Sequence, residues 1–264
     1  MVERWLGEAQ GGAMQTFRRS IGLGLALVLT AGLAAADPTE SEKSPAADPV
    51  AGAAKAATCG GCHGPDGNAP NPAWPKLAGQ QPGYLVKQLS DFQSARRLNP
   101  IMSAMAAPLT PQDIADVSAH FASLPVLPAA AQPADGGADP VADSATTVAN
   151  NGTAGASDAA GARLYREGRP ESGVLPCASC HGLLGEGFAI GVDGGFPSIG
   201  SQNGAYLEAQ LRAFRDGARA NDWEGLMQQM AAGLTDEDIG ALAAYLSRLP
   251  RGSEARTAPP AAGG

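Results

Sequence analysis

The sequence predicts an all-α protein built from two copies of one small helical domain. Three observations lead to this prediction. The segment 59–125 recurs, with a few extra residues, as 177–250. Apolar residues in both copies follow the three- and four-residue spacing of amphipathic helices. No window of the chain shows the sustained alternation of polar and apolar residues that is typical of a β-strand.

The two copies match at positions spread over the whole repeated segment. The matched pairs are Trp74-Pro75 with Phe196-Pro197, Gln80 with Gln202, Tyr84-Leu85 with Tyr206-Leu207, Phe92 with Phe214, Met102 with Met227, and Leu124-Pro125 with Leu249-Pro250. Self-similarity of this extent indicates two copies of one structural unit.

Each copy has the sequence features of three helices. A first helix is expected over about 49–60 in one copy and about 157–168 in the other, before the cysteines. A middle helix follows Pro82 in the first copy and Asn203 in the second, with apolar residues at helical spacing.

The last helix of each copy has the clearest start. Thr110 and Thr235 are N-cap candidates, and acidic residues follow them at the positive end of the helix dipole. Apolar residues then recur at helical spacing, namely Ile114, Val117 and Phe121 in the first copy and Ile239, Leu242 and Leu246 in the second.

The composition divides the chain into five segments. From Met14 onward, a basic start, an apolar run and small residues form a secretory signal peptide, so 1–36 is a signal peptide with an upstream extension. The apolar run is shorter than the roughly 20 residues that span a bilayer. We therefore expect no stable membrane insertion after cleavage, and an uncleaved anchor is the alternative. The other segments are a first domain at 37–125, an Ala/Pro/Gly/Asp-rich linker at 126–160, a second domain at 161–250 and a flexible tail at 251–264.

The charge of the chain excludes one class of partner. The formal net charge is −8, and an acidic protein repels nucleic acid. The charge is also unevenly distributed. The range 55–125 has five basic and four acidic side chains, whereas 161–250 has seven basic and eleven acidic ones.

All four cysteines lie in two Cys-x-x-Cys-His motifs, which are the attachment signature of c-type haem. Spacing of three residues places two thiols on one side of a helical turn, where they can add to the two vinyl groups of one haem. Cys59, Cys62 and His63 form the first motif, and Cys177, Cys180 and His181 form the second. A zinc site would need two further ligands at each motif, and a redox dithiol would not need the histidine. The motifs thus predict two covalently attached haem c groups, with His63 and His181 as iron ligands.

The sixth ligand of each iron is expected further along the chain. A methionine thioether suits a haem of high potential. The first copy offers Met102 and Met105, and the second offers Met227 and Met230. Both pairs align, so the repeat alone does not choose between them.

Three other side chains have two interpretations each. His120 is either a further redox or proton site or a partly exposed helix residue. Tyr84 and Tyr206 either bind a haem propionate or pack with their hydroxyls near the surface.

The chain resembles the diheme cytochromes c4, and each half resembles the single-domain cytochromes c553 of class I. The resemblance covers about 55–125 and 160–250 and includes the motifs WPKLAGQ, YLVKQL and LTPQDIADVSAHFASLP with their second copies. It implies two tandem class I cytochrome c domains, each a small helical fold around a covalent haem. It also implies Met102 and Met227 as the sixth ligands. The carbonyls of Pro75 and Pro197 would accept the Nδ1–H of His63 and His181.

The resemblance implies a periplasmic electron carrier rather than an enzyme. Its donors would be a quinol–cytochrome c reductase or a dehydrogenase, and its acceptor a terminal oxidase. The alternatives are a cytochrome subunit of a periplasmic dehydrogenase, or a diheme enzyme such as a thiosulfate dehydrogenase. Two departures from the family, a longer linker and seven extra residues between His181 and Met227, weigh against direct packing of the two haems.

Overall fold

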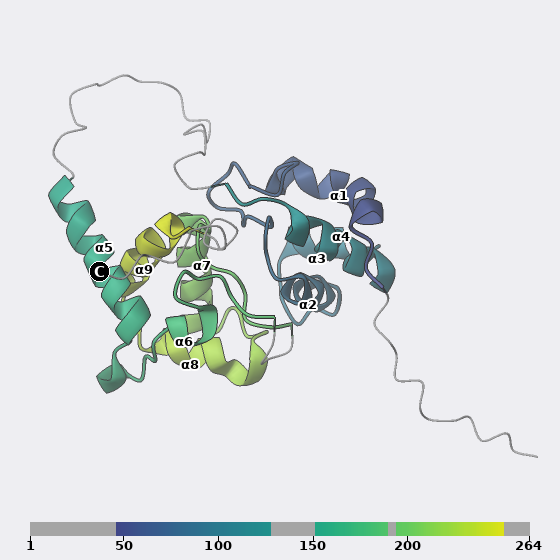
Figure 1. Cartoon of the computed structure of the whole chain (residues 1–264). Coiled ribbons are helices and arrows are strands. Elements are labelled where there is room, and N and C mark those ends of the chain that lie inside the picture. Colours follow the sequence, from purple (N-terminus) through teal and green to yellow (C-terminus); the bar gives the residue numbers. More distant parts are fainter. Residues whose placement is uncertain (1–45, 128–150, 190–193, 251–264) are drawn as a thin grey trace, which may run out of the picture. The chain divides into compact units, whose positions relative to one another are not determined.

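The computed structural model describes residues 46–127, 151–189 and 194–250, with the side chains of 151–157 left out. The predicted signal peptide, nearly all of the linker before 151 and the C-terminal tail lie outside the described residues. Within the described part of the chain there is no strand, and the elements are helices joined by turns (Figure 1). None of the described helices has both the length and the apolar character needed to cross a bilayer.

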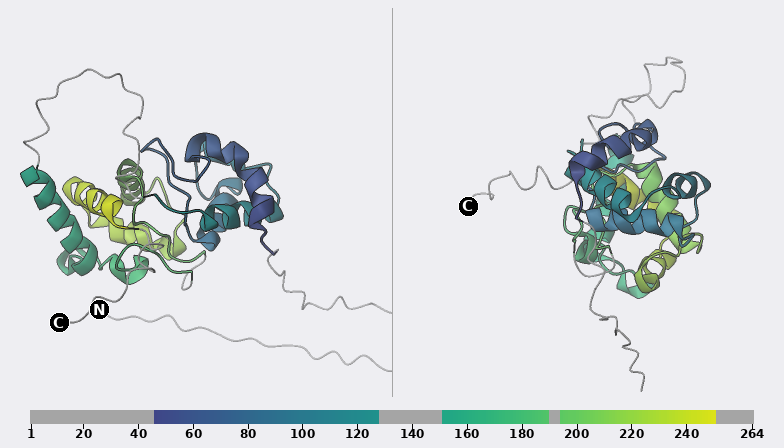
Figure 2. Two further views of the ribbon diagram at one scale, coloured as in Figure 1. Left: turned by 45° about the horizontal axis from the view of Figure 1, so that its top comes forward. Right: turned by 90° about the vertical axis from the view of Figure 1, so that its right-hand side faces the viewer.

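Four helices form the first domain: α1 (Pro49–His63), α2 (Pro82–Gln93), α3 (Pro100–Ala106) and α4 (Pro111–Ser123). Each has a proline in its first turn, where the missing N–H leaves no hydrogen bond unmade. Helix α4 packs on α1 and on α2, and α3 packs on α2. The views of Figures 1 and 2 agree on this arrangement. The buried core cluster of this domain is small and consists of Ala56, Leu85, Val117 and Phe121.

The second domain has the same plan with additional short elements. Its helices are α5 (Asn151–Glu167), α6 (Ala178–His181), α7 (Gly204–Arg215), α8 (Leu226–Ala232) and α9 (Asp236–Arg248), with 3-10 turns at η2 (Pro170–Ser172) and η3 (Trp223–Gly225). Helix α9 packs on α5 and on α7, as α4 packs on α1 and α2. Two isolated bridges, Arg169 with Val174 and Phe188 with Phe196, close the loops around α6.

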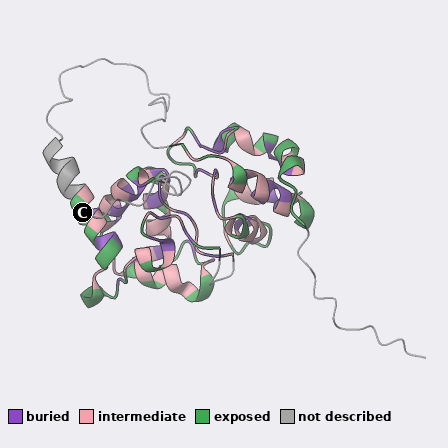
Figure 3. Ribbon diagram, in the orientation of Figure 1, coloured by how far each residue is buried: buried purple, intermediate pink, exposed green. Residues whose placement is uncertain are grey.

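The last helix of each domain begins as the sequence predicts. Thr110 and Thr235 each form a capping box with the aspartate three residues later, Asp113 and Asp238. Such a box satisfies backbone N–H groups that the first turn leaves free. Buried and exposed positions then alternate around both helices (Figure 3).

Two predicted boundaries differ from the structure. Helix α1 continues to His63 instead of ending near residue 60, so it includes the whole first motif. Helix α5 begins at Asn151, about six residues before its expected start near 157, so the end of the predicted linker is helical. The stretch Asn151–Ala160 is rich in Ala and Gly and has no apolar periodicity that would predict a helix.

The two domains are joined by buried hydrogen bonds, in contrast to the loose connection that the long linker suggests. Gln80 of the first domain bonds the backbone of Ser198 in the second. Gln202 of the second domain bonds the backbone of Lys76 in the first. All four residues are buried.

Candidate functional site

The first Cys-x-x-Cys-His motif lies in the last turn of α1. Gly64 ends this helix with φ +80°, directly after His63. A Cβ at Gly64 would lie 2.8 Å from the carbonyl oxygen of Asn68, so this sharp exit requires glycine. Gly182, with φ +82°, ends α6 after His181 in the same way. In both domains the helix therefore ends at the motif histidine, and the chain turns sharply at the glycine that follows it.

Both motif histidines are buried and have one ring nitrogen engaged. His63 Nδ1 lies 2.9 Å from the carbonyl oxygen of Pro75, and His181 Nδ1 lies 3.0 Å from that of Pro197. A carbonyl only accepts, so Nδ1 carries the proton and Nε2 keeps its lone pair for a metal. Burial lowers the pKa of each imidazole and outweighs the bond to the carbonyl, which raises it. Both rings are therefore neutral at pH 7, as iron ligands must be.

The four cysteines are free thiols in this structure. Burial raises the pKa of the Cys59 thiol, and it raises that of Cys177 to about 11. Thiols of raised pKa are poor thiolate ligands and poor redox nucleophiles. Among the described residues, no group of three or more His, Cys, Asp or Glu side chains is placed to hold a metal ion. These observations disfavour the zinc and dithiol alternatives.

The two predicted sixth ligands begin short helices that are capped by a side chain. Asn99 accepts the backbone N–H of Met102 at 2.9 Å, at the start of α3. Asp222 accepts the backbone N–H of Met227 at 2.7 Å, in the first turn of α8. Met227 also packs on the core cluster of the second domain, as Cys177 does. The alternatives Met105 and Met230 lie one turn later and are also partly buried.

Three of the extra residues of the second domain precede Met227 without removing the side-chain cap at that methionine. They form η3 (Trp223–Gly225), between Asn221 and α8. Asp222 reaches across that turn to cap Met227, five residues later, whereas Asn99 caps Met102 three residues later. The longer spacing therefore changes the path of the chain and still fixes the backbone at the methionine.

Exposed apolar side chains lie next to candidate ligands in both domains. The large side chains of Leu98 and Ile101, beside Met102, are 76% and 66% exposed, and Leu183, two residues after His181, is 68% exposed. Exposed apolar side chains next to a candidate site are typical of surfaces that a ligand covers. Each domain thus provides two thiols, a buried imidazole with a free Nε2, a methionine and uncovered apolar side chains. This donor set fits one covalently attached iron porphyrin per domain.

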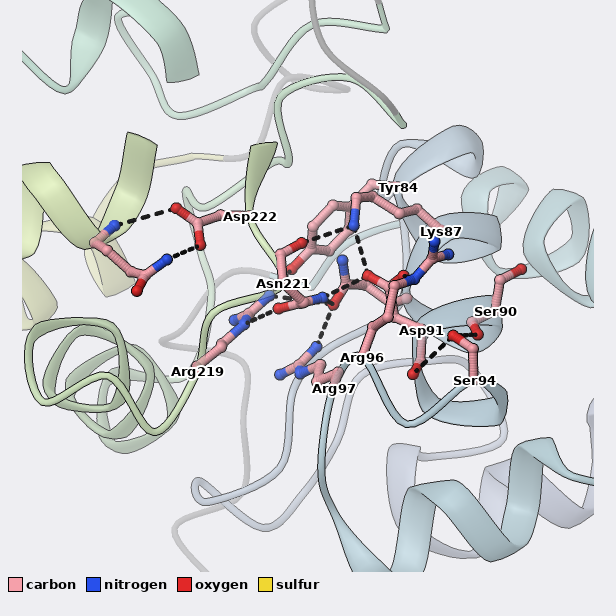
Figure 4. Close-up of polar contacts among 12 residues, drawn as sticks. Tyr84, Lys87, Ser90, Asp91, Ser94, Arg96, Arg97, Arg219, Asn221 and Asp222 are labelled. Carbon is pink, nitrogen blue, oxygen red and sulfur yellow. Dashed lines mark hydrogen bonds and ion pairs between the residues drawn. The ribbon is translucent and has the colours of Figure 1, made fainter. Parts of the chain in front are cut away.

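A buried polar cluster joins the two domains around Arg97 and Arg219, which occupy equivalent positions of the repeat (Figure 4). Arg97 donates to Tyr206 and Gln210 of the second domain at 3.1 and 2.8 Å. Arg219 donates to Tyr84 and Gln88 of the first domain at 3.0 and 3.1 Å. Each guanidinium also lies over the phenylalanine of its own domain, Phe92 or Phe214, at 4.8 and 4.4 Å from the ring centre.

Figure 4 also shows the part of this cluster that is present in only one copy of the repeat. Lys87 binds Asp91 at 2.5 Å and the Asn221 carbonyl of the second domain at 2.7 Å, and Asn221 donates to Asp91 at 2.6 Å. Burial raises the pKa of Tyr84, but the charges of Arg219, Arg97 and Lys87 outweigh it and lower that pKa. With three cationic side chains and one carboxylate, the cluster is net positive.

Sequence reasoning missed this cluster and the partners of its two tyrosines. Tyr84 and Tyr206 were expected either to bind a propionate or to pack with their hydroxyls near the surface. In the structure their hydroxyls accept hydrogen bonds from the arginine of the opposite domain, so they lie at the domain interface, and propionate binding stays a prediction. The alignment of Arg97 with Arg219 was visible in the repeat and was the signal that pointed to a shared role. His120 is a partly buried residue in the last turn of α4, with its ring 5.3 Å from that of Phe121.

Comparison with known proteins supports the haem assignment. The family model of cytochrome c matches residues 49–125 and 159–250. A cytochrome c4 of Thiocapsa roseopersicina is 42% identical over 204 residues, which are 76% of this chain and 93% of that protein. A thiosulfate dehydrogenase electron acceptor of Stutzerimonas stutzeri (strain A1501) is 34% identical over 225 residues, which are 85% of this chain and 91% of that protein. The crystal structure of reduced recombinant cytochrome c4 from Pseudomonas stutzeri has a TM-score of 0.63 and 36% identity, and covers 78% of this chain and 100% of that one.

Proposed function

This chain belongs to the cytochrome c family, as a diheme electron carrier of the cytochrome c4 type, and we propose that it works in the periplasm between respiratory complexes. Its two haem c groups are covalently attached, one to each Cys-x-x-Cys-His motif. The donors would be a quinol–cytochrome c reductase or a dehydrogenase, and the acceptor a terminal oxidase.

The pair of complete ligand sets carries this proposal. Each domain offers a histidine and a methionine for its own iron: His63 with Met102, and His181 with Met227. Iron with both axial positions filled exchanges electrons without binding a substrate, and Met/His ligation raises its potential. The role of the protein is then to hold the ligands still, to limit water at the haem and to present the haem edge to partners.

Visible spectra taken during a redox titration test the proposal. We expect two low-spin haems, each with a methionine–iron band in the oxidised state, and no carbon monoxide binding to the reduced protein at neutral pH. Rapid carbon monoxide binding by either haem of the native protein would show an open iron position and contradict the carrier proposal.

The periplasmic location is supported by the signal peptide features of 14–36 and by the attached haem groups. Fractionation of producing cells, followed by N-terminal sequencing of the product, tests it. We expect a haem-containing periplasmic protein that begins at Asp37. Recovery of the full-length chain with the membranes would favour the uncleaved anchor instead.

A second candidate function is that of electron acceptor for a thiosulfate dehydrogenase. The observation that favours it is the relative of that name, which matches over 85% of this chain. The test mixes the oxidised protein with a thiosulfate dehydrogenase and thiosulfate, or with a quinol–cytochrome c reductase and quinol. Faster reduction by the dehydrogenase would select this candidate. Reduction by thiosulfate alone, with turnover on ferricyanide, would instead identify a diheme enzyme.

A further inference from the structure

The peptide group that holds each haem-binding histidine is itself held by a glutamine of the other domain. The Pro75–Lys76 peptide accepts from His63 Nδ1 through its oxygen at 2.9 Å. The same peptide donates its N–H to the side-chain oxygen of Gln202, in the second domain, at 2.8 Å.

The reciprocal arrangement is present at the other histidine. The Pro197–Ser198 peptide accepts from His181 Nδ1 at 3.0 Å and donates its N–H to the side-chain oxygen of Gln80, in the first domain, at 2.7 Å. Two loops, 75–80 and 197–202, are therefore joined by reciprocal hydrogen bonds. Each loop positions the histidine of its own domain and sends a glutamine to the loop of the other domain.

The geometry leaves each glutamine amide little freedom. The side-chain nitrogen of Gln202 donates to the Lys76 carbonyl at 3.0 Å, and that of Gln80 donates to the Ser198 carbonyl at 2.9 Å. With both ends of the amide engaged, its oxygen must face the peptide N–H. Gln80 and Gln202 are 5% and 3% exposed, and Lys76 and Ser198 are 1% and 2% exposed. Water therefore does not replace these bonds.

Hydrogen bonds in a chain strengthen one another. When a peptide N–H donates, its carbonyl oxygen becomes more negative and accepts more strongly, by roughly 10–30% per bond in condensed-phase estimates. A stronger acceptor at Nδ1 makes the imidazole a better electron donor to its metal, and such outer contacts tune the metal. A better donor stabilises ferric over ferrous iron and lowers the reduction potential.

We propose that Gln80 and Gln202 are positioning residues that set the reduction potential of the haem in the opposite domain. Gln202 acts on the first haem through the Pro75–Lys76 peptide and His63. Gln80 acts on the second haem through the Pro197–Ser198 peptide and His181. The interface thereby does more than hold the domains together, because docking of the two domains completes the environment of both irons. This inference uses the histidine ligation of the proposed function and does not depend on the redox partners.

The experiment replaces each glutamine by methionine, which has similar length and lacks both the acceptor and the donor. The full-length holoprotein is titrated by NMR-monitored reduction, with the haem methyl signals of each domain assigned through their thioether cysteines. For Gln202→Met we expect the reduction equilibrium of the first haem to change about fivefold toward the ferrous state. At 59 mV per tenfold for one electron, this is a rise of about 40 mV. Gln80→Met should produce the same rise at the second haem, and the remaining haem should move much less in each case.

Gln81→Met is the matched control for interface loosening. The Gln81 side chain also crosses to the second domain, where it donates to the Glu186 carbonyl at 3.1 Å, and it does not touch a peptide that binds a histidine. We expect both potentials of this variant to stay at the native values. Gln202→Glu keeps an acceptor oxygen for the Lys76 N–H, so the potential of the first haem should stay at or below its native value.

The Nδ1–H signals provide a readout that general loosening would not produce. In the reduced protein, Gln202→Met should move the His63 Nδ1–H resonance upfield, as expected for a weaker hydrogen bond, and leave that of His181 in place. The proposal is overturned if the shift falls on the haem of the mutated domain, or if Gln81→Met shifts both potentials as much as Gln202→Met does. Native haem spectra in all variants with unchanged potentials would overturn it as well and would leave the carrier function intact.

Discussion

Replacing Gly161 by alanine tests the crossing of α5 and α9, on which the core of the second domain depends. A Cβ at Gly161 would lie 2.2 Å from the Ala241 carbonyl oxygen and 2.8 Å from the Tyr245 Cβ, whereas ordinary contacts begin at 3.4 Å. To accommodate the methyl group, the two helices must separate by about 1.2 Å.

The expected cost follows from two opposing effects. Overpacking a close-packed core costs about 1–3 kcal/mol, and separation also weakens the core cluster in which Leu164 and Tyr165 meet Leu242 and Leu246. Alanine favours the helix over glycine by about 1 kcal/mol. We therefore expect Gly161→Ala to lower the free energy of unfolding of the second domain by about 2 kcal/mol.

Gly240→Ala is the matched control, because Gly240 lies in α9 next to Ala241 and a Cβ there meets no heavy atom within 4 Å. It should raise the free energy of unfolding by about 0.5–1 kcal/mol. Urea unfolding of the holoprotein, followed by circular dichroism and haem absorbance, measures both variants. If Gly161→Ala is as stable as Gly240→Ala, the close crossing of α5 and α9 is wrong.

Three further predictions concern the haem ligands, the interface and the surface charge. Met102→Ala or Met227→Ala should open one iron, so that one haem of the reduced protein binds carbon monoxide and its potential falls. Met105→Ala and Met230→Ala should keep both methionine–iron bands. Loss of a band in Met105→Ala or Met230→Ala would show that the replaced methionine is the ligand. Burial raises the pKa of Asp91, but the hydrogen bonds from Lys87 and Asn221 and the nearby charges outweigh it and lower that pKa; the carboxylate therefore stabilises the fold above its unfolded pKa near 3.9. The stability lost in Asp91→Asn should then be constant at neutral pH and shrink as the pH falls below about 4, and a difference that grows on acidification would refute the sign of this shift. Because the second domain has an excess of acidic side chains, oxidation of its haem by a cationic reagent should slow with added salt more than oxidation of the first haem does. Stopped-flow absorbance measures both rates. Equal dependence of the two rates on salt would contradict the idea that surface charge attracts the reagent more strongly to the second domain.

Local features of the sequence were sufficient to predict the helices that frame each haem. The capping boxes at Thr110 and Thr235 and the apolar spacing that follows them act within one or two turns, so they are visible in a single sequence. The start of α5 was not predictable in this way. The residues before the expected start near 157 show no apolar periodicity in the sequence, so nothing local marks them as helical.

The contacts between the domains were not predictable for a different reason. Gln80 and Gln202 were recognised as equivalent positions, but a repeat shows which residues correspond and not which residues touch. Their partners, Ser198 and Lys76, lie 118 and 126 residues away. Nothing in the local sequence specifies a bond over that distance, because it arises only when two surfaces that are distant in the sequence meet.

The differences between the two copies indicate how the haems become unequal. The residues that make the hydrogen bonds between the two loops and around the two arginines are the same in both copies, namely Gln80 and Gln202, Tyr84 and Tyr206, Gln88 and Gln210, and Arg97 and Arg219. Lys87 and Asp91, in contrast, correspond to Ala209 and Ala213. The symmetric residues dock the domains, and Lys87 and Asp91 add an ion pair that has no counterpart at the equivalent positions of the second domain.

Unequal surroundings bear directly on electron flow. Two haems in identical environments would have equal potentials, and an electron would have no preferred site. An ion pair whose two charges lie at different distances from an iron shifts the potential of that iron, since groups in a low-dielectric interior are little screened. We therefore expect that Lys87→Ala combined with Asp91→Ala, which copies the second domain into the first, brings the two potentials closer together. Potentials that stay as far apart as in the native protein would assign the difference to the extra turn η3 before Met227 instead.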